Sequence, residues 1–107
     1  MNIEEKQKYA LRLLKKYPNN IPIILKKSGI NTPDIDKTKF IVPRDMQVSQ
    51  FIYSIRKRIK LREDQAIYFF FRGELVNTAS TMYEVYENHK SDDDILYGFY
   101  SLENTFG

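Results

Sequence analysis

The feature that most restricts the possible folds is one amphipathic stretch in the middle of the chain. Its apolar side chains recur three or four positions apart, at Val48, Phe51, Ile52, Ile55 and Ile59. The spacing places them on one face of an α-helix, with Arg56, Lys57 and Lys60 on the opposite face. Such a helix is stable only when another element covers its apolar face. We assign Ile55 to the core.

Four short apolar runs flank this helix and can supply the covering sheet. The predicted strands are Ile21–Leu25, Phe40–Val42, Ile67–Phe71 and Ile95–Tyr100. Turn residues at 28–33 indicate that the first two strands form a hairpin. Pro22 has no N–H for a ladder, so this strand should have a free edge near it.

Two further helices are predicted outside the central one. In the first, Glu4–Lys16, the residues at i, i+3, i+4 and i+7 are Ala10, Leu13, Leu14 and Tyr17. Leu14 and Tyr17 should pack inward, while Leu13 should reach the surface of the sheet. Thr81 and Glu84 have the spacing of a capping box and indicate a short helix.

Strand, strand, helix, strand and strand is the order of an α+β fold of the β-grasp (ubiquitin-like) type. We therefore expect a mixed four-stranded sheet with an added N-terminal helix, in which Ile21–Leu25 pairs with Leu96–Tyr100. The 107 residues suffice for a single core. We divide this one globular unit into a helical extension (1–20), a β-grasp domain (21–101) and a tail (102–107).

Composition excludes several classes of function. With no cysteine, the chain has neither disulfides nor a thiolate nucleophile, which suits a reducing compartment. No apolar run is long enough to span a membrane, and the first residues lack the apolar core of a signal peptide. The net charge of +3 fits weakly anionic partners without choosing among them.

No catalytic or metal-binding constellation emerges, so we expect neither an enzyme nor a cofactor. His89 is the only histidine, with no identifiable acid–base partner. The run Asp92–Asp94 does not have the spacing of a calcium loop. The basic run Arg56–Lys60 is compatible with nucleic-acid binding. A solvated helix face is favoured instead, because no aromatic residue is interleaved for base stacking.

The sequence ends in Gly107. A terminal glycine leaves its own carbonyl free of side-chain crowding and adopts almost any φ and ψ. Both properties suit a carboxylate that is activated and transferred to an amine.

Several blocks of sequence, in order and ending at this glycine, resemble the ubiquitin-like autophagy modifiers of the GABARAP type. Lys15–Pro22 resembles the family's K-K-Y-P-D-R-V-P, Asp36–Pro43 its D-K-K-K-Y-L-V-P, Val48–Phe51 its V-G-Q-F and Ile55–Ile59 its I-R-K-R-I. The remaining blocks are Tyr86–His89, Leu96–Tyr97, Tyr100–Ser101 and Glu103–Gly107. Family members usually carry a longer segment before the first helix, so the resemblance implies a shortened N-terminus.

The resemblance implies that Gly107 becomes joined to the amine of phosphatidylethanolamine. Activating and conjugating enzymes would carry it there through thioesters, and a cysteine protease would process and release it. The protein would be cytoplasmic and monomeric before conjugation, and on the autophagosome or a vesicle membrane afterwards. There it would recruit cargo receptors and autophagy machinery that carry a [W/F/Y]-x-x-[L/I/V] motif. No nucleic acid is expected as a partner.

The motif would add to an edge strand at Lys39–Val42 and fill two pockets. Alternation along this strand sends Lys39 and Ile41 to one face of the sheet and Phe40 and Val42 to the other. By the resemblance, the aromatic pocket is lined by Leu13, Pro22, Ile24, Lys39, Ile41 and Ile95. The aliphatic pocket is lined by Phe40, Val42, Pro43, Met46, Phe51 and Ser54. Lys37, Lys39 and Arg58 would meet acidic residues that flank the motif.

Three positions depart from the family pattern. Ile95 stands where Phe is usual, Ser54 where a larger apolar residue is usual, and Tyr9 replaces an acidic residue at the pocket rim. Because of these departures, a ubiquitin-like adaptor that is never conjugated is the alternative, and a basic nucleic-acid-binding module is a third possibility.

Overall fold

The computed structural model describes residues 2–102. Its helices are α1 (Ile3–Lys16), α2 (Val48–Ile59) and α3 (Met82–His89). Its strands are β1 (Asn20–Lys27), β2 (Lys39–Pro43), β3 (Tyr68–Phe71), β4 (Glu74–Leu75) and β5 (Leu96–Ser101). The predicted helices and strands are all present, with ends that differ by no more than two residues.

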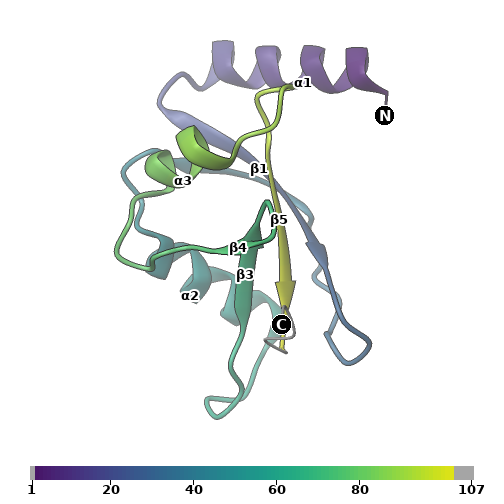
Figure 1. Ribbon diagram of the computed structural model, residues 1–107, viewed down its shortest axis with the longest axis vertical. Coiled ribbons are helices and arrows are strands. Elements are labelled where there is room, and N and C mark those ends of the chain that lie inside the picture. Colours follow the sequence, from purple (N-terminus) through teal and green to yellow (C-terminus); the bar gives the residue numbers. More distant parts are fainter. Residues whose placement is uncertain (1, 103–107) are drawn as a thin grey trace.

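Within the described residues the strands form one mixed sheet in the order β2-β1-β5-β3-β4 (Figure 1). β1 is antiparallel to β2 and parallel to β5, and β5 is antiparallel to β3. The final strand is therefore central, as the β-grasp prediction requires. Pairing of β1 with β5 begins at Ile23 opposite Leu96. Pro22 precedes this first pair, so the edge of β1 that faces β5 is free at Pro22. Across β2, Pro22 lies opposite Ile41 in a pair that is not hydrogen-bonded, so its missing N–H removes no ladder bond.

The prediction of four strands is wrong by one. β4 pairs with β3 through Leu75 opposite Phe70 and Glu74 opposite Phe71. The intervening Arg72 and Gly73 have φ values of 53° and 75°. Two consecutive positive φ values are typical of the tight turn that joins hairpin strands. A strand of two residues is too short to show an alternation in the sequence.

The core lies between the sheet and α2. Phe51 of α2 is 1% exposed and meets Phe40 and Phe69 edge-on, with ring centroids 5.9 and 6.0 Å away. Ile55, one turn later, is fully buried. Along β1, Ile21, Ile23 and Leu25 belong to this core. The helical stripe and the strands thus bury each other, as the sequence pattern predicts.

The other face of the sheet is covered at one end by α1. Ala10 is fully buried against Ile24 and Ile95, which form a second, smaller cluster. Leu13 and Leu14 are half-buried. The prediction that Tyr17 packs inward is wrong, since this side chain is exposed. α1 ends at Lys16, and Tyr17 leaves the helical path with φ −131° and ψ 71°.

Gly98 in the middle of β5 provides the most sensitive test of this packing. A Cβ at this position would lie 2.6 Å from Phe71 Cε1 and 2.9 Å from Leu25 Cδ2, and both neighbours are fully buried. We expect Gly98→Ala to lower the free energy of unfolding by about 1–3 kcal/mol, because the core must shift to admit a methyl group. Denaturant titration measures this loss.

Gly73→Asn is the matched control for that measurement. A Cβ at Gly73 would meet no atom of the described chain within 4 Å, apart from its chain neighbours. Asparagine also tolerates the positive φ found there. The control should therefore retain nearly the full stability, and an equal loss in both variants would contradict the packing argument.

Candidate functional site

β2 lies at one edge of the sheet and can accept another strand. The Leu25 amide donates to the Thr38 carbonyl at 2.8 Å. This bond shows which residues of β1 and β2 form the hydrogen-bonded pairs. In an antiparallel ladder, bonding positions alternate. The backbone groups of Phe40 and Val42 therefore face β1, while those of Lys39 and Ile41 point to the outer edge. These outer groups are the ones an extended peptide would bond.

The side chains of β2 alternate between the two faces of the sheet, as predicted. Lys39 and Ile41 are exposed, whereas Phe40 and Val42 are buried. Register places Ile41 beside Pro22 and Lys39 beside Ile24. The edge is consequently flanked by a different apolar surface on each face.

On the α1 face, strand register and packing bring together five of the six residues predicted for the aromatic pocket: Pro22, Ile24, Lys39, Ile41 and Ile95. Pro22 and Ile24 are buried, Leu13 is half-buried, and Ile41 remains 36% exposed. Ile95 is fully buried beneath α1, so it can form the floor of this surface but not its rim. The Lys39 ammonium lies 5.0 Å from the centre of the Tyr9 ring. Tyr9 thus lies beside Lys39 and packs against the cluster that contains Ile24 and Ile95.

Asp93 fixes the start of β5 below this surface. Its carboxylate accepts from the Ile95 amide at 3.1 Å and from the Tyr97 hydroxyl at 2.6 Å. Burial, together with this hydrogen bond, raises the pKa of Tyr97 well above its usual range. The Asp93 carboxylate therefore positions Ile95. Sequence reasoning had found no role for it beyond that of a charged loop.

Most of the residues predicted for the aliphatic pocket lie on the α2 face, but the alternation of β2 places Pro43 on the same face as Ile41. Phe40, Val42 and Phe51 are buried in the main core, and Met46 packs against it. Pro43 and Ser54 are exposed. The buried rings of Phe40 and Phe51 therefore lie close to the exposed Ser54, which is three residues after Phe51 on α2. The Ser54 hydroxyl donates to the Phe51 carbonyl at 2.8 Å, so its proton is already used within the helix.

Two cations border the Phe40 ring. The Lys37 ammonium lies 5.3 Å from the ring centroid and the Arg58 guanidinium 5.7 Å from it. Arg58 Nη1 also lies 3.0 Å from both carboxylate oxygens of Asp36. Asp36 thus holds Arg58 in place. Sequence reasoning missed this role, because no local pattern links residues 22 positions apart.

The match of the chain to a known family agrees with this geometry. Residues 5–107 match the family model described as "Autophagy protein Atg8 ubiquitin like". The chain belongs to the Atg8 family of ubiquitin-like autophagy proteins.

Relatives from plants and fungi share much of the sequence with this Atg8-family chain. "Autophagy-related protein 8a" of Arabidopsis thaliana is 47% identical over 106 residues, which cover 98% of this chain and 87% of the relative. "Autophagy-related protein 8" of Mycosarcoma maydis is 47% identical over 107 residues, covering 99% and 91%. The crystal structure of Trypanosoma brucei ATG8 superposes with a TM-score of 0.84 at 31% identity, covering 94% of this chain and 88% of the other.

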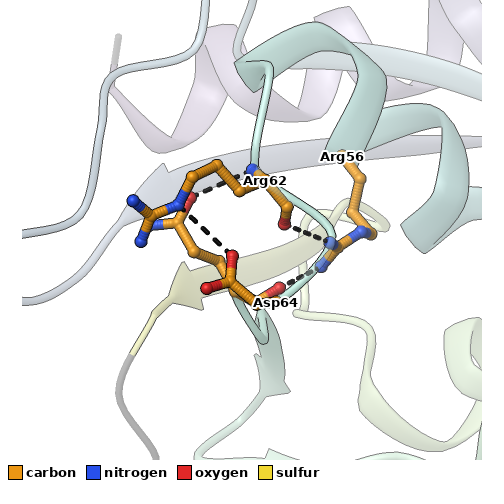
Figure 2. Close-up of polar contacts among 4 residues, drawn as sticks. Arg56, Arg62 and Asp64 are labelled. Atoms are coloured by element: carbon orange, nitrogen blue, oxygen red, sulfur yellow. Dashed lines mark hydrogen bonds and ion pairs between the residues drawn. The ribbon is translucent and has the colours of Figure 1, made fainter.

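Arg56 has a structural role in this Atg8-family chain. Its guanidinium donates to the Gln65 carbonyl at 2.7 Å and to the Arg62 carbonyl at 3.0 Å. Figure 2 shows Arg56 reaching from α2 to the turn that precedes β3, where Arg62 also pairs with Asp64 at 3.3 Å. Because these bonds hold its guanidinium, Arg56 is not free to contact a nucleic-acid phosphate. Tyr53, 61% exposed, does lie beside Lys57, with the ammonium 4.5 Å from the ring centroid.

His89 has partners that sequence reasoning did not identify. Its Nε2 lies 3.2 Å from a Glu74 carboxylate oxygen and its Nδ1 lies 3.1 Å from the Val85 carbonyl. The residue joins α3 to β4. Across residues 2–102, no cluster of three or more His, Cys, Asp or Glu side chains could hold a metal ion.

Two predictions concern the membrane. Gly107, the predicted conjugation point, lies outside the described residues. In the described part of the chain, none of the helices combines the length and the apolar character needed to cross a bilayer.

Proposed function

We propose that this Atg8-family protein is a GABARAP-type modifier conjugated through Gly107 to phosphatidylethanolamine on autophagosomal membranes. The family match supports this proposal, because it extends to the terminal glycine. Activating and conjugating enzymes of the autophagy system would transfer the protein from the cytoplasm to the lipid. A cysteine protease would process and release it. Reconstituted conjugation, described in the Discussion, tests this step.

On the membrane, the protein would recruit cargo receptors that carry a [W/F/Y]-x-x-[L/I/V] motif. The observation that carries this proposal is the edge of β2, where the outer backbone groups of Lys39 and Ile41 lie between two apolar surfaces. The peptide would extend the sheet at this edge. Its aromatic residue would rest on the α1 face beside Ile41 and Pro22. Its aliphatic residue would rest on the α2 face near Phe40.

The expected affinity follows from this geometry. Each apolar side chain that the groove buries contributes on the order of 1.5–3 kcal/mol. Backbone pairing adds to this, and the cost of ordering an extended peptide offsets much of it. A dissociation constant of roughly micromolar order results.

The motif's last position should prefer Leu or Ile over Val. Ser54 has a small side chain at the mouth of the α2-face pocket, and its hydroxyl proton is satisfied by the Phe51 carbonyl. The pocket therefore offers room for a larger aliphatic group. Calorimetric titration of three peptides that differ only at this position measures the preference.

Ser54→Leu is the control for this experiment. It fills the same space and should move the preference toward Val. If the unsubstituted protein already prefers Val, or if the folded protein binds none of the three peptides, the groove does not work as proposed.

Arg58→Ala should weaken binding of a peptide with acidic flanking residues by only a few-fold, and mainly at low salt. The Arg58 side chain is exposed and already pairs with Asp36. An exposed ion pair contributes about 0–1 kcal/mol and is screened by salt. Dissociation constants measured at low and high salt separate this effect from a loss of packing.

Asp36→Ala and Lys57→Ala complete that comparison. Asp36→Ala frees Arg58 and should strengthen binding of the same peptide. Lys57 lies beside Tyr53 instead of Phe40, so Lys57→Ala should have little effect. An equal loss in Arg58→Ala and Lys57→Ala would mean that net charge alone attracts the peptide.

A further inference from the structure

We infer that the loop between β1 and β2 inserts its tip, Ile30, into the bilayer to which the protein is conjugated. This inference rests on the proposed attachment of Gly107 to a lipid. It adds a noncovalent membrane contact made by this chain's own surface.

Ile30 is presented to solvent by a well-defined turn. The side chain is 99% exposed. Gly29, just before it, has φ +91°, a conformation that glycine adopts without strain. Thr32, two residues later, is 4% exposed. The loop is therefore anchored on both sides of an apolar tip that contributes nothing to the core.

The same loop is bonded to the base of the C-terminal tail. The Ser28 amide donates to the Tyr100 carbonyl at 2.8 Å, and the Leu102 amide donates to the Thr32 hydroxyl at 3.4 Å. The Thr32 hydroxyl in turn donates to the Ser28 carbonyl. Tyr100 is 1% exposed, and its hydroxyl donates to the Pro33 carbonyl at 2.8 Å. Loop and tail base thus form one bonded unit.

The length of the tail limits how far this unit can lie from a conjugated lipid. Five residues separate Leu102 from the carboxyl end of Gly107. A fully extended chain spans at most about 3.3–3.6 Å per residue, so the tether reaches no more than about 18 Å. Figure 1 shows the β1–β2 connection and the described C-terminal end on the side of the molecule away from α1. The tether therefore holds the end of the molecule that carries this loop, and not the end that carries α1, near the bilayer.

The charges beside the loop suit a phospholipid surface. Lys26 is exposed, and Lys27 pairs with Asp34 at 2.8 Å while its side chain remains 47% exposed. Two lysines and one aspartate leave a local excess of positive charge. Lipid phosphates attract such lysines, and the acyl region removes the Ile30 side chain from water. A protein partner is disfavoured, since the tether fixes which surface the loop meets.

Tryptophan fluorescence tests this contact, because the chain contains neither Trp nor Cys. Ile30→Trp introduces a single fluorophore, and Gly107→Cys allows coupling to maleimide-phosphatidylethanolamine in vesicles without any enzyme. Leu11→Trp, on the exposed side of α1, is the matched control, since Leu11 is 62% exposed. Vesicles that contain lipids with brominated acyl chains quench a tryptophan that enters the bilayer.

We expect coupling to shift the emission of the Ile30→Trp protein to the blue and to quench it. The coupled Leu11→Trp protein and both uncoupled proteins should show neither change. No quenching at position 30, or equal quenching at position 11, overturns the inference. Because the chemical tether bypasses conjugation, failure of enzymatic lipidation would count against the proposed function and not against this contact.

Hydrogen exchange keeps the test independent of the introduced tryptophan. In the Gly107→Cys protein with Ile30 intact, coupling should slow the exchange of amides 29–31. Ile30→Asp should abolish this protection, since a carboxylate does not enter the acyl region. Protection that survives Ile30→Asp unchanged would also overturn the inference.

Discussion

Deletion of Gly107 is expected to abolish formation of the phosphatidylethanolamine adduct. The truncated chain ends in Phe106, whose side chain crowds the carbonyl that an amine must attack. Glycine has no side chain and adopts φ and ψ values that other residues avoid. With activating enzyme, conjugating enzyme, ATP and liposomes, the intact protein should form a lipid adduct, which electrophoresis separates from the free form.

Gly107→Ala is the control for this deletion. It keeps the length of the tail and adds only a methyl group, so adduct formation should be slower than with glycine but should not vanish. Equal lipidation of the protein that lacks Gly107 would rule out the terminal glycine as the conjugation point. If the intact protein forms no adduct and still binds the peptide, the non-conjugated adaptor becomes the better description.

Periodic patterns predicted most of the fold. The stripe from Val48 to Ile59 spans the bounds of α2 as observed, because its burial repeats with the helical period. The central place of β5 followed from the order of the elements. β4 could not be predicted in this way, since a strand of two residues has no period. Its only local signal is Gly73 directly after the strand that ends at Phe71, and a single glycine marks the end of a strand as readily as a hairpin turn.

The site was less predictable than the fold. Alternation along β2 predicted which side chains leave the core, and the structure places Lys39 and Ile41 outside as expected. Contacts between distant segments were not predictable. The pairing of Arg58 with Asp36 and the bonds from Arg56 to the Arg62 turn depend on how α2 lies across the sheet. Such geometry emerges only once the chain has folded.

Phe51→Ala and Ile41→Ala should separate the effects on stability from those on peptide binding. Phe51→Ala should cause the larger loss of stability. The Phe51 side chain is 1% exposed and contacts the rings of Phe40 and Phe69. Removing a buried phenylalanine costs about 3–5 kcal/mol, from the lost transfer free energy and from the cavity that remains. The free energy of unfolding of a typical domain is only about 5–15 kcal/mol, so this loss is a large part of it. Denaturant titration measures it, and Phe51→Leu, which fills most of the space, should lose less.

Ile41→Ala should show the opposite balance. The side chain is 36% exposed at the outer edge of the sheet, so the free energy of unfolding should change little. Peptide binding should weaken by roughly tenfold or more, because the variant removes apolar surface beside Pro22 on which the aromatic residue rests. Calorimetry at a temperature where both variants are folded measures this loss. If Ile41→Ala binds as tightly as the unsubstituted protein at that temperature, the peptide does not use this edge. Binding that weakens in Ile41→Ala without a loss of stability would place the peptide against β2, since no core contact depends on that side chain.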